Sequence, residues 1–538
     1  MRIFGTTQPI YESSELSYKI GRLVANYEFF ISLFCYSGFD EYHIFCPNYN
    51  NADLTSRRIK RENIPEEIKK RIKVFHICSL KKMVRQNDYY VFHVCGWGFY
   101  FPGLIHLRNS HARKLFPVTG IIHSLNSSET AYHALKTSLA PALPFDSIIC
   151  SSECGKIVMK NLFDDTSSNF SDADYRGRFD RIPLGISPDF SEVPDKNDSR
   201  GGLGINTDDL VILTLGRLTP SKKMDFGPLF KTIKKVSMRT SKNIVFILAG
   251  SADKREELLI KNMLREYGIE DITRLAVNFD NSLKKKLYAA SDIYAAPVDN
   301  LQETFGLSVA EAMACGCVPV ISDFNGYSEL VEDGKTGIKV PSYWTDISGL
   351  YDGMSELINF STYQLLISQS IVIDMHKMES AIIELDNNPE KMEKISEAAS
   401  VKARTDYLWP SIIKRYCGLW KELSENVSGY SKKPERKTNP WEINHFKNFR
   451  HYVTAEIKMT SIIEKAGNTK IPVPYSDVGA SLINPEVIKF IISKMPAKAL
   501  KASGLYGIIK SNVNLSEQEF MFCISWSCKY GLMRIVEI

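Results

Sequence analysis

Two glutamates, Glu303 and Glu311, lie on either side of a predicted helix start in the stretch ETFGLSVAEAMACGC, which is otherwise small and apolar. The segment from Gly306 to Gly316 predicts a helix, so Glu303 falls in the loop before its first turn and Glu311 in its second turn. A carboxylate can accept hydrogen bonds from two neighbouring hydroxyls, which suits it to bind polyols. The pair therefore predicts a site for a ligand rich in hydroxyl groups.

The start of the same helix predicts an anion site. Four backbone amides are expected to lack partners inside the helix, those of Thr304, Phe305, Gly306 and Leu307. Free amides at the positive end of the helix macrodipole favour a phosphate. Glu311 would then accept from hydroxyls on one side of this phosphate, and Glu303 from hydroxyls on its other side.

The segment GRLTPSKK, residues 216–223, supplies positive charge. Arg217 and Lys222 flank a proline-containing turn at the carboxyl end of a predicted strand, which places them at the same site. A diphosphate is well matched by one guanidinium fork and one ammonium point charge. The anion site, the carboxylates and the two cations together predict a nucleoside diphosphate sugar as the ligand.

A parallel sheet is expected to position these groups. Between about 208 and 341, apolar segments alternate with helical patterns, and the strand segments are LVILTLG (210–216), IVFILAG (244–250), LAVNF (275–279) and DIYAAP (292–297). Apolar strands that alternate with helices form a parallel sheet covered on both faces. We expect residues 206–408 to form a Rossmann-like domain that binds the donor nucleotide, with its first helix over 222–239.

Residues 1–195 show the same alternation less cleanly, in the segments YHIFCP, YYVFHVCG, VTGIIHS and FDSIICSS. They predict a second Rossmann-like domain, which would bind the acceptor and is joined to the first by the linker SEVPDKNDSRGGLGINTDD. Ligands bind outside the carboxyl ends of the strands in open α/β sheets. The predicted fold class is therefore α/β, with two Rossmann-like domains facing a cleft.

A small accessory domain is predicted at 441–538, after the charged, proline-containing linker GYSKKPERKTNP. Its helices end in one strand, which resembles a winged helix, and Ser516 with Glu519 predicts a capping box before a helix closed by Gly531. We expect this domain to bind a protein partner or to mediate self-association. Nucleic acid is the less favoured partner because the lysines are spread rather than clustered with aromatics: Lys489, Lys494, Lys498, Lys501 and Lys510.

Composition limits the class of protein. The 67 basic and 62 acidic side chains give a net charge of +5, too mild a bias to indicate nucleic-acid binding, and 44% of the residues are hydrophobic, as in globular proteins. The first residues turn polar too early for a signal peptide, and no apolar run approaches the ~18 residues that span a bilayer. We expect a cytoplasmic protein that at most touches a membrane peripherally.

The stretch from Leu215 to Pro341 resembles the donor domain of the retaining glycosyltransferases of family 4, which have the GT-B fold. It contains the turn G-R-L-x-P-x-K as GRLTPSK, the signature y-a-x-A-D-x-x-x-x-P as LYAASDIYAAP, and the E-x7-E motif as ETFGLSVAE. The segments EAMACGCVPV, GYSELVEDGKTG and LWPSIIKRYCGLWKEL follow in the family's order. The order of these matches makes the resemblance specific.

The resemblance implies a role for each candidate residue. Arg217 and Lys222 would hold the donor diphosphate, Glu311 the ribose hydroxyls and Glu303 hydroxyls of the transferred sugar. His123, in GIIHSLNS, matches a histidine that lies beside the donor sugar in the family. A helix over 409–428 would cross back to the N-terminal domain.

The resemblance also implies a reaction, the transfer of a hexose from a UDP- or GDP-linked donor to a hydroxyl acceptor with retention of configuration. The leaving phosphate would help to deprotonate the acceptor, so neither an enzymic nucleophile, a metal nor a cofactor is expected. The acceptor remains open among a glycan, a lipid-linked saccharide, a metabolite and a peptide or protein. Two alternatives are a GT-B epimerase or phosphorylase, and a non-catalytic binding protein that acts through 441–538.

Several positions depart from the family or carry weaker expectations. Lys223 stands where the family usually has glycine after the turn lysine, and Asp280 also replaces a frequent glycine. We expect His93, at the end of a strand, to be either an acceptor contact or a structural residue. We expect a solvated helix face for Lys284, Lys285 and Lys286, and buried positions for Trp409 and Trp420.

Overall fold

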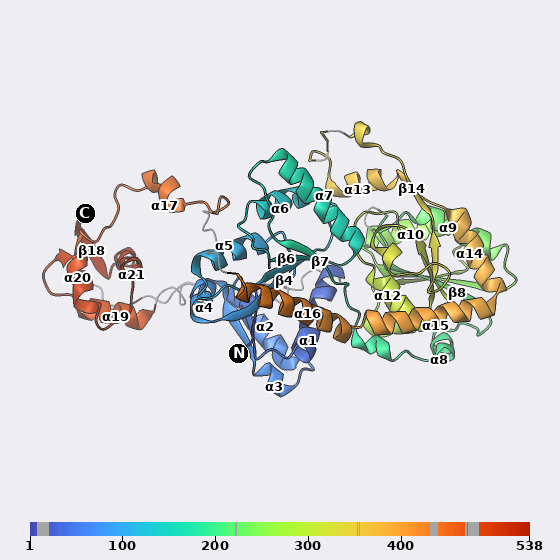
Figure 1. Cartoon of the computed structure of the whole chain (residues 1–538), viewed down its shortest axis with the longest axis horizontal. Helices are drawn as coiled ribbons and strands as arrows, with labels where there is room; N and C mark the ends of the chain where they lie inside the picture. Colours follow the sequence, from blue (N-terminus) through green and yellow to red (C-terminus); the bar gives the residue numbers. More distant parts are fainter. Residues whose placement is uncertain are drawn as a thin grey trace. The chain divides into compact units, whose positions relative to one another are not determined.

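The computed structural model describes residues 1–7, 21–220, 223–351, 353–354, 356–430, 439–467, 471 and 484–538 (Figure 1). These residues divide into two compact units: the first comprises Met1–Pro47 and Asn51–Asn439, and the second comprises Pro440–Ile538 together with Asn48–Asn50. The first unit contains two large parallel sheets, and we call the parts of the chain built around them the N-lobe and the C-lobe. The second unit contains a small antiparallel sheet.

The N-lobe sheet has seven parallel strands in the order β3-β2-β1-β4-β5-β6-β7. The strands are β1 (Ile3–Thr6), β2 (Glu41–Cys46), β3 (Ile72–His76), β4 (Tyr89–Val94), β5 (Val118–Ile121), β6 (Ser147–Cys150) and β7 (Arg178–Arg181). The helices between them are α1 (Gly21–Tyr36), α2 (Tyr49–Arg61), α3 (Glu66–Lys69), η1 (Ile77–Ser79), α4 (Leu80–Gln86), α5 (Phe101–His111), α6 (Ser128–Ser138) and α7 (Glu153–Asn169). Strands such as SIIC in β6 are wholly buried, as expected for a parallel sheet between layers of helices.

The C-lobe sheet has six parallel strands in the order β10-β9-β8-β11-β12-β13. The strands are β8 (Leu210–Arg217), β9 (Ile244–Ser251), β10 (Thr273–Val277), β11 (Ile293–Ala296), β12 (Val318–Ser322) and β13 (Ile338–Val340). The helices are η2 (Pro188–Ser191), α8 (Lys196–Leu203), α9 (Phe226–Ser237), α10 (Lys254–Glu266), α11 (Asn281–Ala290), α12 (Leu307–Ala314), η3 (Asn325–Glu329), α14 (Met375–Asn387) and α15 (Pro389–Asp406). The two sheets confirm the predicted pair of Rossmann-like folds.

The helix that follows β8, α9, starts later than predicted, at Phe226 instead of 222. Asp225 fixes this start because its carboxylate accepts a hydrogen bond of 2.9 Å from the Gly227 amide. A carboxylate at this position satisfies an amide that has no partner inside the helix. The segment before α9 is thereby separated from the helix. Ser221 and Lys222 lie outside the described residues.

An excursion interrupts the C-lobe between β13 and α14. It consists of the antiparallel pair β14 (Ser342–Trp344) and β15 (Ile371–Ile373), with η4 (Ser348–Leu350) and α13 (Phe360–Ser368) between them. The excursion explains why the regular alternation of strand and helix patterns stops after Pro341.

The chain crosses between the lobes twice, and the two crossing segments are hydrogen-bonded to each other. The Ile186 amide donates to the Tyr407 carbonyl at 2.8 Å, and the Trp409 amide donates to the Ile186 carbonyl at 3.1 Å. Gly185 lies directly under the Trp409 ring, since a Cβ atom at this glycine would be 2.2 Å from it. The two crossings therefore form one paired connection.

Helix α16 (Trp409–Ser428) continues from the second crossing and packs on α1 and β4 of the N-lobe (Figure 1). Trp409 and Trp420 are buried, as predicted. The Trp420 indole donates to Thr119 Oγ1 at 3.2 Å, and the Trp409 indole donates to Glu28 at 3.0 Å. Both tryptophans thus anchor α16 to the N-lobe.

The second unit contains more strands than predicted. Its sheet has the order β17-β16-β18 and consists of β16 (Ile462–Lys465), β17 (Leu500–Lys501) and β18 (Met533–Glu537). Its helices are α17 (His445–Asn448), η5 (Arg450–Tyr452), α19 (Pro485–Ser493), α20 (Ala502–Ile509) and α21 (Glu517–Lys529). Only β18 was expected from the sequence, because β16 and β17 are too short to show a pattern. The capping box of Ser516 and Glu519 is present, and Gly531 follows α21 with a φ of +69°.

Within the part of the chain that the structure describes, no helix combines the length and apolarity needed to cross a membrane.

Candidate functional site

Two of the predicted site residues, Arg217 and Glu303, lie at the carboxyl ends of the C-lobe strands. Arg217 is the last residue of β8, and Glu303 lies in the loop between β11 and α12. In an open parallel sheet, ligands bind at this edge, where the strand order reverses. Here the order reverses between β8 and β11, so the two residues flank the switch point.

Helix α12 presents an uncapped N-terminus at this edge. Its N-cap is Gly306, which has a φ of +110° and provides no side chain to accept from the first amides. The helix begins at Leu307, so Thr304 and Phe305 lie in the approach rather than in the first turn. Such an end can receive an anion, because its amides point toward the ligand along the positive end of the macrodipole.

Gly326, at the start of η3, packs against the backbone of this approach. A Cβ atom at Gly326 would lie 2.3 Å from the Thr304 carbonyl carbon and 2.5 Å from the Phe305 nitrogen. The Gly326 amide also donates to the Glu303 carbonyl at 3.3 Å. The absence of a side chain at Gly326 therefore allows the loop before α12 to take its position.

Glu303 is held by a lysine that was not among the predicted site residues. Lys223 Nζ lies 3.0 Å from Glu303 Oε1 and 2.6 Å from the Tyr327 hydroxyl. Burial opposes ionisation of Glu303, but the charges of Lys223 and Arg217 outweigh burial and lower the pKa of Glu303 below its ordinary value. The sequence signal for Lys223 was its replacement of a glycine, whereas nothing in the sequence indicated Tyr327.

Arg217 also has a partner in the loop before α12, since its Nη2 atom donates to Gln302 Oε1 at 3.0 Å. The guanidinium is thus hydrogen-bonded to Gln302, the residue that precedes Glu303 in the same loop. Lys222, the second predicted cation, lies outside the described residues. Arg217 and Glu303 are brought together as predicted, and Lys223 occupies the space beside them.

Glu311 is buried and engaged through both of its oxygens. Lys284 Nζ donates to Oε1 at 2.6 Å, and the Tyr288 hydroxyl donates to Oε2 at 3.0 Å. The expectation that Lys284 lies on a solvated face was wrong, because α11 turns this lysine toward α12. Burial and the charge of Glu311 both raise the pKa of Tyr288, so its hydroxyl remains a donor.

A further carboxylate, that of Glu28, faces Glu311 and Lys284 from the N-lobe. Glu28 on α1 has its pKa raised to about 7, mainly by burial and then by the nearby charge of Glu311. The Trp409 indole and the charge of Lys284 act in the opposite direction. Sequence reasoning missed Glu28, because a single glutamate on a helix carries no pattern.

The two candidate histidines of the N-lobe have different environments. His123 follows β5, is partly buried, and its Nε2 atom lies 2.9 Å from the Cys95 carbonyl oxygen. His93 is buried inside the core, where its Nδ1 atom lies 2.9 Å from Thr119 Oγ1. Burial, with a smaller contribution from the nearby His123, lowers the pKa of His93 to about 3. Of the two expectations for His93, the structure supports the structural residue.

The lobes contact each other beside α12. Ser151 Oγ of the N-lobe donates to the Thr304 carbonyl at 3.1 Å. The first amides of α7, those of Glu153 and Cys154, donate to the Glu329 carboxylate at 2.9 and 2.7 Å. The N-lobe therefore borders the loop that carries Glu303.

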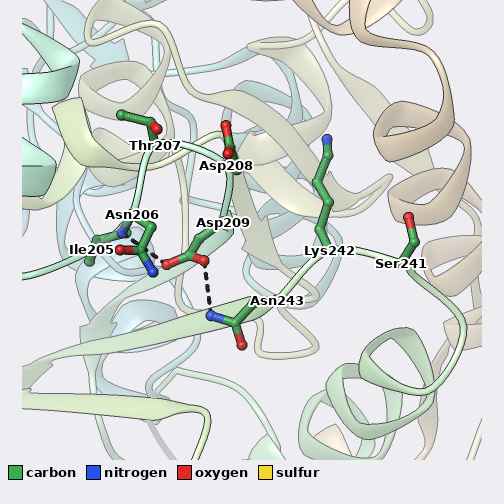
Figure 2. Close-up of a pocket in the computed structure, with 8 residues that line it drawn as sticks. All are labelled: Ile205, Asn206, Thr207, Asp208, Asp209, Ser241, Lys242 and Asn243. Atoms are coloured by element: carbon green, nitrogen blue, oxygen red, sulfur yellow. Dashed lines mark hydrogen bonds between the residues drawn. The ribbon is translucent and has the colours of Figure 1, made fainter.

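A shallow hollow of about 760 Å³ lies elsewhere, at the amino ends of β8 and β9 (Figure 2). Asp209 points into a local network in which it accepts from the Asn206 amide and from the Asn243 side chain (Figure 2). This end of the sheet is opposite the edge that carries Arg217. The hollow is therefore separate from the candidate site.

No cluster of three or more His, Cys, Asp or Glu side chains suited to a metal ion occurs among the described residues. Among the described residues, the cations at the candidate site are Arg217, Lys223 and Lys284, of which Lys223 pairs with Glu303 and Lys284 with Glu311. The α12 terminus adds partial positive charge.

Part of the chain is similar in sequence to known proteins. Residues 195–364 match the profile of the family described as Glycosyl transferases group 1. A D-inositol 3-phosphate glycosyltransferase of Catenulispora acidiphila is 29% identical over 193 residues, which cover 34% of this chain and 45% of that protein. A glycogen synthase of Fusobacterium nucleatum is 26% identical over 224 residues, which cover 42% of this chain and 41% of that protein. The chain thus spans less than half the length of these curated relatives.

Solved structures resemble more of the chain. The whole chain of a sucrose-phosphate synthase from Thermosynechococcus elongatus aligns with 79% of this chain, with a TM-score of 0.54 and 16% sequence identity. The whole chain of the HepE protein of Anabaena, solved in complex with UDP, aligns with 80% of this chain, with a TM-score of 0.51 and 16% sequence identity. These similarities show the fold, so the first unit has the predicted GT-B architecture.

Proposed function

We propose that this chain is a glycosyltransferase that moves a hexose from a nucleoside diphosphate sugar to a hydroxyl acceptor with retention of configuration. The observation that carries the proposal is the convergence of three features at one sheet edge: Arg217, the uncapped start of α12, and the carboxylates Glu303 and Glu311. Cations and helix amides suit a diphosphate, and carboxylates suit the hydroxyls of ribose and sugar. The group 1 family match over 195–364 supports the same assignment.

Each group has a proposed part in the reaction. Arg217 and the α12 amides bind the diphosphate and stabilise the negative charge that develops on it as the sugar departs. Glu303 holds hydroxyls of the sugar, and Glu311 holds the ribose, displacing the hydrogen bonds it now receives. Lys222 contributes a second cation, and His123 lies beside the sugar. Positioning and charge stabilisation then supply most of the catalysis, so the proposed reaction needs neither a metal nor a cofactor.

UDP and GDP are the first nucleotides to test. The structural neighbour HepE was solved with UDP, which makes UDP the leading candidate for the donor. The N-lobe is proposed to select the acceptor from glycans, lipid-linked saccharides, metabolites and polypeptides. A polypeptide is favoured on the hypothesis that the second unit acts as a separate binding module.

A thermal-shift panel tests the donor site. UDP, GDP, ADP and TDP, alone and as sugar conjugates, are added to the wild type, to Arg217→Ala and to Lys231→Met, an exposed lysine of α9 that serves as the control. A ligand at about 100 times its Kd stabilises the folded state by roughly 2.7 kcal/mol, which is a measurable shift. We expect one base to stabilise the wild type and the control variant but not Arg217→Ala.

The same panel can overturn the proposal. If none of the nucleotides or conjugates shifts the wild type, the donor site is not functional. A shift that is equally large in Arg217→Ala would place the nucleotide away from the edge of the C-lobe sheet. Mass spectrometry of acceptor mixtures incubated with the binding donor then identifies the acceptor class.

A further inference from the structure

Lys223 is a buried cation within the candidate site. Its side chain is 5% exposed, and its ammonium contacts Glu303 Oε1 at 3.0 Å and the Tyr327 hydroxyl at 2.6 Å. The aliphatic stem packs on Gly216, where a Cβ atom would lie 2.9 Å from Lys223 Cε. A buried ammonium is costly unless it is paired and hydrogen-bonded, and Lys223 meets both conditions.

The partners of Lys223 belong to a network that joins β8 to α12. An ammonium can only donate, so the Tyr327 hydroxyl accepts from Lys223. This hydroxyl lies 3.5 Å from Ser308 Oγ in the first turn of α12. Ser308 Oγ in turn lies 2.8 Å from the hydroxyl of Tyr294, which is 2.9 Å from the Leu215 carbonyl.

Glu303 has one oxygen in this network and one outside it. Oε1 accepts from Lys223, whereas Oε2 makes no hydrogen bond or ion pair to any other described residue. Among the described residues, Arg217, Tyr327 and Tyr294 are the other charged or titratable groups that face this carboxylate. Removal of Lys223 would therefore leave a largely buried carboxylate that, among the described residues, is stabilised by the more distant charge of Arg217.

We propose that Lys223 is a positioning residue for the transferred sugar: it fixes the carboxylate of Glu303 through Oε1 and leaves Oε2 to accept from a sugar hydroxyl. The inference rests on the proposed function, because it takes Glu303 as the group that binds the sugar. It goes further by assigning a role to a residue outside the turn motif. The lysine supplies an internal counter-charge, so the hold on the sugar depends on a residue that does not touch it.

The test compares the sugar with the nucleotide that carries it. Isothermal titration gives the Kd of UDP and of UDP-glucose, or of the nucleotide pair found by the panel, for the wild type, Lys223→Met, Tyr327→Phe and the exposed control Lys231→Met. We expect Lys223→Met to raise the Kd of the conjugate about tenfold and to leave the Kd of the nucleotide unchanged, since hydrogen bonds to charged groups carry this much free energy. Tyr327→Phe keeps the aromatic ring but removes the hydroxyl. It should raise the Kd of the conjugate as well, by a smaller factor.

A pH series gives a readout that a purely structural lysine would not move. The lowered pKa of Glu303 keeps its carboxylate charged in the wild type, so the extra affinity for the sugar is lost only in acid. In Lys223→Met the ammonium that opposes the effect of burial is absent, so the pKa of Glu303 should be higher. The loss of affinity for the sugar should therefore begin at a higher pH than in the wild type. The melting temperatures of the variants, measured without ligand, identify any variant that fails to fold, and Tyr327→Phe then carries the test.

Three results separate the inference from the proposed function. An equal loss of nucleotide and conjugate binding in Lys223→Met would overturn the inference, because the lysine would then act on the diphosphate or on the fold. Unchanged binding of both ligands, with an unchanged pH profile, would overturn it as well. Failure of the wild type to bind any nucleotide sugar would instead overturn the proposed function, together with the role given to Lys223.

Discussion

Glu28 illustrates how much a single side chain can depend on residues far along the chain. It lies on α1, yet its carboxylate accepts from the indole of Trp409, and it faces Glu311, Lys284 and Asp189. Its pKa is raised from 4.5 to about 7 because it is buried. The native state therefore retains a proton that the unfolded chain releases between these two pH values.

This proton makes a testable contribution to stability. Because the folded-state pKa is the higher one, stability falls as the pH rises from 4.5 through about 7, and above this window Glu28 is charged and destabilising. We expect Glu28→Gln, which still accepts from Trp409, to be about 1–3 kcal/mol more stable than the wild type at pH 8 and no more stable at pH 4.5. Urea unfolding at the two pH values measures the difference.

The exposed Glu66→Gln on α3 is the matched control, and it should show no such dependence on pH. A stability difference between Glu28→Gln and the wild type that is the same at both pH values would contradict the raised pKa.

The residues of the candidate site were predictable where they form a local motif. The positions of Arg217 and Glu303 at one sheet edge follow from the order of strands and helices. The pairings of Lys223 with Glu303 and of Lys284 with Glu311 were not predictable, since they join residues 80 and 27 positions apart. Such contacts depend on how helices pack, and a single sequence shows no pattern for them.

At the scale of elements, the position of the α12 start depends on a close backbone approach. Gly326→Ala would place a methyl group 2.3 Å from the Thr304 carbonyl carbon, and either η3 or the loop before α12 must move. We expect this variant to lose about 1–3 kcal/mol of stability, as overpacked sites do, and to bind nucleoside diphosphate more weakly. Chemical unfolding and titration with the nucleotide measure the two effects.

Gly349 in η4 provides the control, because a Cβ atom there would meet nothing within 4 Å. Gly349→Ala should change neither stability nor binding. Nucleotide binding that survives unchanged in a destabilised Gly326→Ala would show that the ligand does not use the α12 terminus.

Most C-lobe strands, and β2, β4, β5 and β6 of the N-lobe, could be predicted because parallel strands are continuous apolar segments between helical patterns. The strands β1, β3 and β7 were not among the predicted segments. The start of α9 was misplaced because the carboxylate of Asp225, rather than the hydrophobic pattern, sets it. The strands β16 and β17 were missed because four and two residues are too few to show a period.

At the scale of the whole molecule, each of the two units has its own core. The buried clusters of the first unit contain no described side chain from beyond Asn439. The second unit buries its own apolar residues, among them Ile463, Ile488, Leu505 and Phe520. Neither core therefore requires residues of the other.

A shortened chain that ends at Tyr430 should for this reason fold and bind the nucleotide with the Kd of the full chain. Calorimetric melting and titration of both chains measure this. Loss of nucleotide binding in the shortened chain would show that the second unit completes the donor site. Retained binding and turnover would exclude the alternative in which residues 441–538 perform the function and the GT-B unit is only a scaffold.

The paired crossing at Ile186 has a mechanical consequence. One covalent tether would let two bodies swivel about several axes, but the two tethers here are tied together by hydrogen bonds and packed under the Trp409 ring. Such a paired connection should resist twisting more than a single strand would. A relative motion of the lobes is therefore expected to begin and end with Ser151 at the Thr304 carbonyl in the same register.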